Sequence, residues 1–194
     1  VFVANRQART ATEAGFQETA RAHSVAVDQE VRVAIAALRI LASSDHMQAD
    51  DLKTFEREAR ASLTNQTDWE NLVLFSPTGQ GVLNFHLPPG GPLPRSTRPE
   101  LIDRVVRSRG PAVSGLFRAP VRGTPLVEVA VPVLQAGAVK YILSAYLSSN
   151  AIVRILAQQR MPAEGVASLL DQDRIVIART WLPEQFVGRQ APPE

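Results

Sequence analysis

Two segments of the chain repeat one pattern of apolar and polar residues, and this repeat restricts the possible folds. Residues 71–84 and 166–179 each consist of an apolar run, a short polar turn and a second apolar run that ends in a polar residue. Apolar runs on both sides of a tight turn predict a β-hairpin. The same hairpin in two places, in the same phase, predicts two copies of one supersecondary unit. The alignment has no gap and pairs Phe75 with Leu170, Ser76 with Asp171, Val82 with Ile177 and Asn84 with Arg179.

A long helix is predicted before the first copy. Residues 6–43 contain no Gly or Pro except Gly15. A helix of about 40 residues would be about 60 Å long at a rise of 1.5 Å per residue, which is more than the core of such a domain needs. Residues 27–41 suit an ordinary core helix, whereas residues 1–20 predict a stalk or a helix that pairs with a second copy. The helix stripe, with steps of three and four near the coiled-coil period, consists of Phe16, Ala20, His23, Val27, Val31, Ala34, Leu38 and Leu41.

The next hundred residues predict an α+β fold. A shorter helix capped by Asp50 or Asp51 comes first. Strands are then predicted over 69–75, 80–85, 112–117, 125–134 and 139–147. A helix between the second and third strands is expected to start at a capping box formed by Thr97 and Glu100, and to end at Gly110. This order predicts a five-stranded, mainly antiparallel sheet with helices against it.

The pattern divides the chain into three parts. Residues 1–45 form the long helix, residues 46–147 the first module, and residues 148–194 the start of a second module. The second hairpin is not followed by the helix and three strands that follow the first one, so we expect the second module to be incomplete in this chain. The opening residues lead directly into the helix, which suggests a chain that starts just after a membrane span.

Composition excludes several classes of function. The sequence has 45% apolar and 21% charged residues and a net charge of +2, as in an ordinary globular protein. The basic residues are dispersed and are not interleaved with aromatic residues, so they indicate solvated charge and not a nucleic-acid surface. The absence of cysteine excludes disulfides, thiol catalysis and thiolate metal sites. No apolar run reaches the roughly 18–20 residues that a membrane span needs.

The sequence carries no convincing catalytic or metal-binding motif. His23, His46 and His86 lie far apart, and none has a second ligand at metal spacing. Asp171 and Asp173 fit a turn better than a cation site. We therefore predict no catalytic residue, no metal and no cofactor.

Binding of a small molecule is the better hypothesis, and the candidate residues have alternatives. Arg95 and Arg98 lie where the loop and helix begin to cover the sheet, and a guanidinium there could hold a carboxylate or phosphate with two hydrogen bonds. The alternative is a pair of solvent-exposed loop arginines. Glu128 is either a pocket acceptor or a charge that protects an edge strand. Trp69 either anchors a strand or stacks on a ligand. The full candidate set is Trp69, Arg95, Arg98, Ser114, Glu128, Tyr141 and Ser144, of which Tyr141 and Ser144 should lie on opposite faces of their strand.

The apolar strands and their turns resemble a known family. The segments that carry the resemblance are 69–74 with Pro77 and Gly79, then 113–116, 129–133, 168–171, 175–179 and 186–188. Together they are similar to the periplasmic double Cache (PDC, PAS-like) sensor region of bacterial membrane histidine kinases and diguanylate cyclases. The similarity extends over nearly the whole chain.

The resemblance implies a particular arrangement in a longer protein. A first transmembrane helix would precede residue 1, and a second one and a cytoplasmic output domain would follow the chain. The first module would be membrane-distal and would bind ligands between its sheet and the loop and helix after the second strand. The Arg-x-Trp-Tyr signature of the amino-acid-binding branch is absent between Leu87 and Gly110. Recognition of amino acids through that motif is therefore not expected.

These observations lead to one main hypothesis and two alternatives. We expect a periplasmic sensor domain of a membrane receptor, foremost a sensor histidine kinase, that binds a small molecule such as a small carboxylate and forms a homodimer through its N-terminal helix. The chain itself would not be an enzyme, because the kinase domain would lie outside it. The alternatives are the sensor region of a diguanylate cyclase, and a dimerisation or protein-interaction module that binds no ligand.

Overall fold

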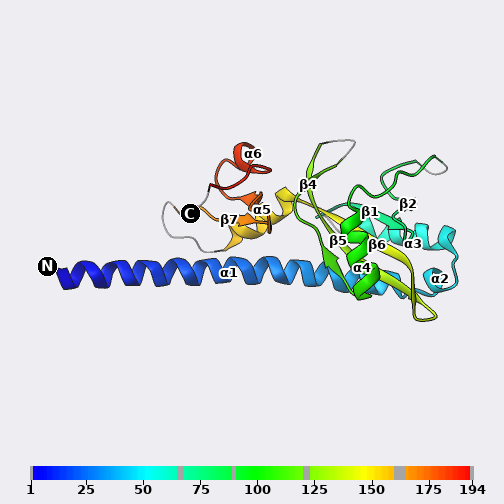
Figure 1. Cartoon of the computed structure of the whole chain (residues 1–194), viewed down its shortest axis with the longest axis horizontal. Helices are drawn as coiled ribbons and strands as arrows, with labels where there is room; N and C mark the ends of the chain where they lie inside the picture. The colour runs from blue at the N-terminus through cyan, green and yellow to red at the C-terminus, as the bar shows by residue number, and fades with distance from the viewer. Residues whose placement is uncertain (1, 65–67, 89–90, 120–122, 160–164, 193–194) are drawn as a thin grey trace. The chain divides into compact units, whose positions relative to one another are not determined.

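The computed structural model describes residues 2–64, 68–88, 91–119, 123–159 and 165–192, with side chains except those of residues 2–14, 62 and 64. It divides into two compact units. One, the hairpin unit, comprises residues 1–30 and 149–194, and the other, the sheet unit, comprises residues 31–148. Helix α1 (Phe2–Ala42) contributes to both units (Figure 1), whereas the sequence analysis assigned residues 1–45 to a helix of its own.

The sheet unit confirms the predicted α+β fold. Its antiparallel sheet has six strands in the order β2-β1-β6-β5-β3, and β4 also pairs with β5. The predicted strand over 112–117 is two short strands. Between them the hydroxyl of Ser114, not a backbone carbonyl, accepts the N–H of Glu128 at 2.8 Å. The strands are β1 (Trp69–Phe75), β2 (Gly81–Asn84), β3 (Ala112–Val113), β4 (Phe117–Arg118), β5 (Pro125–Gln135) and β6 (Ala138–Ser148).

One face of the sheet packs against helices. The second part of α1, α2 (Asp45–Gln48) and α3 (Leu52–Thr64) cover this face. Asp51 caps α3, since its carboxylate accepts the N–H of Thr54 at 3.1 Å. Residues that are fully buried here come from the helices and from alternate strand positions: Ala34, Leu38, Met47, Phe55, Ala59, Leu72, Leu74, Val129, Val131, Leu143 and Ala145.

Helix α4 (Pro99–Ser108) lies on the opposite face of the sheet, where Leu101, Ile102 and Val105 are buried. The predicted capping box is wrong. Arg98 occupies the N-cap position, and no side chain caps the helix. Pro99 explains this, because a residue before proline is held out of the helical conformation and proline itself needs no N–H acceptor at the first helical position. The helix ends at Ser108, because Arg109, one residue before the predicted Gly110, adopts the left-handed conformation with φ of 51°.

The hairpin unit contains the second copy of the repeated hairpin. Strands β7 (Ser168–Leu170) and β8 (Val176–Arg179) pair as β1 and β2 do, and each hairpin has a register shift at the last residue of its first strand. The turns use the same hydrogen bonds. The side chain of Ser76 accepts the N–H groups of residues 78 and 80, and the side chain of Asp171 accepts those of residues 173 and 175. The hairpin unit also contains α5 (Ser149–Gln158) and α6 (Pro183–Phe186).

The repeat continues beyond the hairpins. In the first copy Gln80 bridges to Arg95, and in the second copy Ile175 bridges to Gln190 at the equivalent position. The N–H of Gly81 bonds to the carbonyl of residue 94, and that of Val176 to the carbonyl of residue 189. In both copies, therefore, a later segment of the chain pairs with the second strand of the hairpin in the same register.

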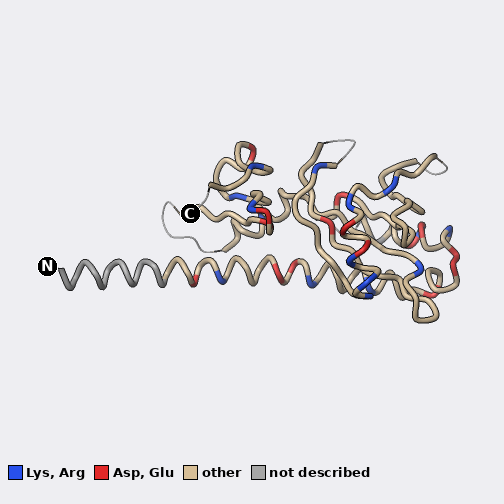
Figure 2. The backbone as a smooth tube through the Cα atoms, in the orientation of Figure 1, with Lys and Arg blue, Asp and Glu red and all other residues tan. Residues whose placement is uncertain are grey.

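Charged residues are interspersed over both units. Figure 2 shows acidic and basic positions mixed along the described part of α1 and across the sheet unit. Among the described helices, none has both the length and the hydropathy for a membrane span.

Candidate functional site

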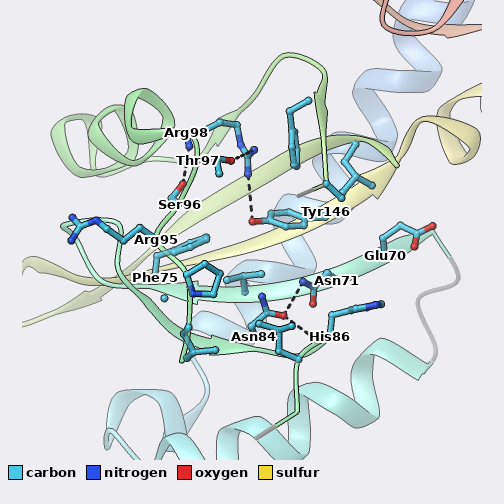
Figure 3. A pocket seen from close by; sticks show the side chains of 18 of the residues that line it. Glu70, Asn71, Phe75, Asn84, His86, Arg95, Ser96, Thr97, Arg98 and Tyr146 are labelled. Carbon is cyan, nitrogen blue, oxygen red and sulfur yellow. Dashed lines mark hydrogen bonds between the residues drawn. The ribbon is translucent and has the colours of Figure 1, made fainter. Parts of the chain in front are cut away.

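A cavity of about 220 Å³ opens in the sheet unit, on the same face of the sheet as α4. Strand alternation builds its floor, because Asn71, Val73 and Phe75 point to one face of β1 and Tyr146 of β6 points to the same face. The segment 93–98, which leads into α4, forms another wall (Figure 3). The cavity thus lies between the sheet and the loop after the second strand.

The walls of the cavity are mainly apolar. A pocket of this kind binds small molecules through apolar contact, while a few polar groups fix their orientation. Its volume is below the roughly 300 Å³ of the smallest typical drug pockets, so it suits a molecule of metabolite size. The apolar lining consists of Val73, Phe75, Leu87, Leu93, Pro94, Phe117, Ala119, Leu126 and Tyr146.

A buried ion pair stands beside this cavity. Arg98, which lines it, is 7% exposed, and Glu128 is fully buried. The Nε atom of Arg98 donates to Oε2 of Glu128 at 2.6 Å, and Nη2 donates to the same oxygen. Nη1 donates to the hydroxyl of Thr97 at 3.0 Å. The carboxylate therefore neutralises the guanidinium within the protein.

Two aromatic rings enclose the guanidinium. Its central carbon lies 3.4 Å from the centroid of the Phe117 ring and 5.5 Å from that of Tyr146. The two rings meet edge to face at 5.4 Å. Nη2 of Arg98 also donates to the Tyr146 hydroxyl at 3.4 Å. Burial, reinforced by the negative charge of Glu128, raises the pKa of Tyr146 well above its ordinary value, so the hydroxyl stays protonated.

Ser114 fixes the backbone of Glu128. The two residues are joined twice: Glu128 donates its N–H to the Ser114 hydroxyl at 2.8 Å, and Ser114 donates its N–H to the Glu128 carbonyl at 2.9 Å. Oε1 of Glu128 is buried and has no hydrogen-bond partner in the part of the chain that the structure describes. Among the described residues, the donors to this carboxylate therefore all belong to Arg98, and they bind its other oxygen, Oε2.

A second polar group lies on the cavity wall formed by β1 and β2. Asn71 donates from Nδ2 to Oδ1 of Asn84 at 3.0 Å, and the backbone N–H of His86 donates to the same oxygen at 3.0 Å (Figure 3). Oδ1 of Asn71 is buried, and no described residue gives it a hydrogen bond. Buried acceptors are almost always paired, so this one is suited to a donor on a ligand.

Arg95 also lines the cavity, but it differs from Arg98 in its exposure and in its hydrogen-bond partner. It is exposed, and its Nη2 donates to the carbonyl of Thr78 at 2.6 Å. The prediction of exposed loop arginines thus describes Arg95, whereas it is wrong for Arg98. The edge-strand alternative for Glu128 is wrong as well, because β5 pairs with β6 on one side and with β3 and β4 on the other.

Three of the sequence candidates lie away from the cavity. Trp69 is buried in the core on the helix-covered face, as expected of a strand anchor. Tyr141 lies on that face too and donates to Asp50 at 2.8 Å; burial, and then this hydrogen bond, raise the pKa of Tyr141 to about 12. Ser144 is buried among the strands, and its hydroxyl has no hydrogen-bond partner within the described ranges. As the alternation predicts, Tyr141 and Ser144 lie on opposite faces.

Sequence reasoning missed Tyr146, Phe117, Asn71 and Asn84. Tyr146 could have been found from Ser144, since residues two apart on a strand share a face. Asn71 and Asn84 are polar residues in apolar strands, which is also a visible signal. Nothing in the sequence pairs Arg98 with Glu128, because the contact depends on how α4 is placed over the sheet.

The hairpin unit has a cavity of its own, about 300 Å³ in volume, between α1, α5 and the segment 165–169. His23 lines it and is buried. Its Nδ1 lies 2.7 Å from the carbonyl of Thr19 and its Nε2 lies 3.1 Å from that of Leu156, so the ring joins α1 to α5. This is a structural role for the histidine on the predicted helix stripe.

Neither a protein-family model nor a curated protein matches the sequence. Solved structures do match the fold. The ligand-binding domain of the Pseudomonas fluorescens chemoreceptor CtaA, in complex with L-isoleucine, is 14% identical with a TM-score of 0.69, and the match covers 98% of this chain and 76% of that one. The sensor domain of the V. cholerae histidine kinase DctB is 11% identical with a TM-score of 0.67, covering 95% and 72%.

A third similar structure is the ligand-binding domain of the Pseudomonas aeruginosa PAO1 amino acid chemoreceptor PctC, in complex with GABA. It is 13% identical with a TM-score of 0.61, and the match covers 90% of this chain and 76% of that one. The fold is therefore that of Cache-type sensor domains, as the sequence resemblance predicted.

Proposed function

We propose that this chain is the extracytoplasmic sensor part of a bacterial transmembrane receptor, and that it binds a small molecule in the cavity of the sheet unit. The observation that carries the proposal is the cavity itself. It is mainly apolar, it lies next to a buried ion pair, and it is lined by Asn71, whose Oδ1 has no hydrogen-bond partner among the described residues. The fold that the chain shares with ligand-binding and sensor domains supports the proposal.

The sheet provides a route from the cavity to α1. Cavity residues of β1 alternate with Leu72 and Leu74, which pack on the opposite face with Ala34 and Leu38 of α1. A ligand that prefers one of two packings of the sheet against α1 would shift the population of that packing. We propose that the helix carries this change as a shift or rotation.

The output domain is proposed to be a histidine kinase, for which the similarity to DctB is the support. A diguanylate cyclase is the alternative. In either case the catalytic domain would lie outside this chain, whose own role would be binding.

A thermal-shift screen tests the binding proposal. Purified chain is screened against amines, amides, amino acids, carboxylates and phosphates. A ligand at 100 times its Kd stabilises the folded state by about 2.7 kcal/mol, which is a readable shift. The shift should be lost in Asn71→Ala, which removes a cavity residue, and kept in Thr19→Ala, a residue of the other cavity. No shift in any class, or a shift that Asn71→Ala leaves unchanged, would contradict the proposal.

We further propose that the receptor dimerises through α1. An exposed stripe runs along the helix at steps of three and four residues, on the side away from the buried positions Val27, Ala34 and Leu38. Val25 is 67% exposed and Ile40 72%. Such spacing suits pairing of helices. In a parallel pair, the flank that carries Arg32 would face the flank that carries Glu30 of the second copy. The stripe consists of Ala22, Val25, Gln29, Val33, Ala36 and Ile40.

The absence of cysteine in this chain allows a direct test of the dimer. Val25→Cys in the full-length receptor in membranes should form a disulfide-linked dimer on mild oxidation. Ser24→Cys is the matched control, because it is also exposed but points about 100° away around the helix. Equal cross-linking at both positions, or none at Val25→Cys, would argue against this interface.

A further inference from the structure

We propose that Glu128 takes the place that a ligand carboxylate would occupy on Arg98. The cavity would then select small apolar molecules that carry a hydrogen-bond donor, as an amine or a primary amide, and lack a carboxylate. This inference rests on the proposed function, because it names the ligand class of the same cavity. It also replaces the expectation of a small carboxylate that the arginines suggested.

The first argument is the donor count of Arg98. A guanidinium has five N–H groups and binds carboxylates best through a pair of parallel ones. Nε and Nη2 form such a pair, and both donate to Glu128. Nη1 donates to Thr97, and Phe117 lies against the guanidinium carbon at 3.4 Å. The Arg98 guanidinium therefore has no free pair of parallel N–H groups for a ligand carboxylate, and the face that Phe117 covers is closed to it.

The second argument concerns charge. The Arg98–Glu128 pair is neutral as a whole, and Glu128 is held in place by two backbone hydrogen bonds with Ser114 and by complete burial. A ligand carboxylate beside Arg98 would bring a second negative charge close to Glu128. Two carboxylates that share one cation in a water-poor site repel each other. The pair therefore disfavours an anion beside Arg98.

The remaining cation does not replace Arg98. Arg95 is exposed, and one of its amino groups is already bound to the carbonyl of Thr78. A carboxylate placed there would remain hydrated, and exposed ion pairs contribute little. We therefore expect Arg95 to bind an anionic ligand only weakly.

The third argument is the chemistry of Asn71, a polar residue that lines the cavity. Oδ1 of Asn71 is a buried acceptor with no hydrogen-bond partner among the described residues, and Asn71 lines a cavity whose walls are mainly apolar. A ligand N–H would satisfy it, whereas a carboxylate, which has no donor, would add a further unpaired acceptor. Glu70 also lines the cavity, but it is exposed like Arg95, so neither of these two opposite charges gives a strong preference.

A matched series of three compounds tests the inference. The compounds 3-methylbutylamine, 4-methylpentanamide and 4-methylpentanoate present a similar branched apolar body with a cationic, a neutral and an anionic head group. Titration calorimetry and thermal shift on the purified chain should show binding of the amine and the amide, and at least tenfold weaker binding of the carboxylate. Asn71→Leu should weaken the amine and the amide at least tenfold.

Glu128→Gln is the decisive variant. It keeps the size of the side chain and an oxygen that can accept from Arg98, but it removes the negative charge. We expect it to increase the affinity for 4-methylpentanoate at least tenfold and to leave that for the amide within about threefold. Should Glu128→Gln fail to fold, the wild-type series together with Asn71→Leu still decides the ligand class.

The outcomes separate this inference from the proposed function. If 4-methylpentanoate binds the wild type as tightly as the amine does, and if Arg98→Met abolishes that binding, the inference is overturned while the proposed function stands. The inference is also overturned, and the proposed function also stands, if none of the three compounds binds but the wider screen yields a carboxylate-bearing ligand whose binding depends on Asn71. If no compound in the wider screen binds, both fail.

Discussion

Removal of Arg98 should destabilise the sheet unit far more than removal of an ordinary loop arginine. In Arg98→Met the long apolar stem is retained and only the charge and the donors are lost. Glu128 would then remain as a fully buried carboxylate, because Arg98 supplies the side-chain hydrogen bonds to Oε2, and Oε1 has no partner among the described residues. Arg95→Met is the matched control, since Arg95 is an exposed arginine in the same segment.

The magnitude follows from the burial of the pair. Removal of one partner of a buried ion pair costs about 3–5 kcal/mol, because the other charge is left unpaired in a water-poor site. The loss of the contact with the Phe117 ring acts in the same direction. Arg95→Met should cost less than about 1 kcal/mol, as exposed charges do. The double variant Arg98→Met/Glu128→Leu should recover most of the loss, since apolar replacement of both partners is often neutral.

The two tryptophans allow the measurement to be made on each unit separately. Trp69 is buried in the sheet unit, and Trp181 lies in the hairpin unit. In a Trp181→Phe background, urea unfolding followed by fluorescence reports the sheet unit through Trp69. Comparison of the midpoints at equal m-values gives the change in unfolding free energy.

Two results would refute the reasoning. A loss below about 1 kcal/mol in Arg98→Met would mean that Glu128 does not depend on this partner. A double variant as unstable as the single one would mean that the loss comes from packing around residue 98 and not from the unpaired carboxylate. In a double-mutant cycle the coupling energy should instead be large and of the sign that marks a favourable pair.

Three further predictions concern titration and packing. Both tyrosines of the chain have raised pKa values in the folded state, Tyr141 to about 12, whereas the unfolded value is about 10. The stabilisation of the folded state by the protonated tyrosines is therefore complete below pH ~10 and is lost as the pH rises above it. Phenolate absorbance near pH ~10 should appear only after unfolding, and titration of the native protein at the ordinary pKa would contradict this. Phe55→Ala, at a fully buried position, should cost about 3–5 kcal/mol in urea unfolding, against less than about 0.5 kcal/mol for exposed Val33→Ala, and similar losses for the two would disprove the core position. Gly81→Ala should cost more than about 1 kcal/mol, because its Cβ would lie 2.6 Å from the carbonyl oxygen of Pro94, whereas Gly91→Ala has no atom closer than 3.9 Å and serves as the control.

Much of the fold could be predicted because local patterns determine it. The hairpins were visible as apolar runs around polar turns, and the core face of α3 as Phe55 and Ala59 at helical spacing. Their agreement with the structure reflects consistency between local preference and the global fold. The start of α4 was predicted less well, since Thr97 and Glu100 fit a capping pattern that the proline between them overrides.

The candidate site was only partly predictable, because it is assembled by tertiary contacts. Both arginines were correctly expected at the start of the cover over the sheet, yet they have opposite environments. The difference depends on Glu128, which is thirty positions later in the sequence and reaches Arg98 across the gap between β5 and the start of α4. The position of charged Glu128 in an otherwise apolar central strand indicated a special role, but its partner Arg98 could be identified only from the three-dimensional structure.

The repeat itself leads to a final prediction, about the turn of the second hairpin. Asp171 holds this turn, because its Oδ1 accepts the N–H groups of Asp173 at 3.0 Å and Ile175 at 2.9 Å. Ser76 does the same in the first hairpin with a hydroxyl. Asp171→Ala should therefore destabilise the hairpin unit by about 1–2 kcal/mol, whereas Asp171→Ser, which installs the side chain of the other copy, should lose at most about half of this. Fluorescence of Trp181 in a Trp69→Phe background reports that unit. Equal losses in the two variants would show that the charge of Asp171, and not the hydrogen bonds that the two copies share, stabilises the turn.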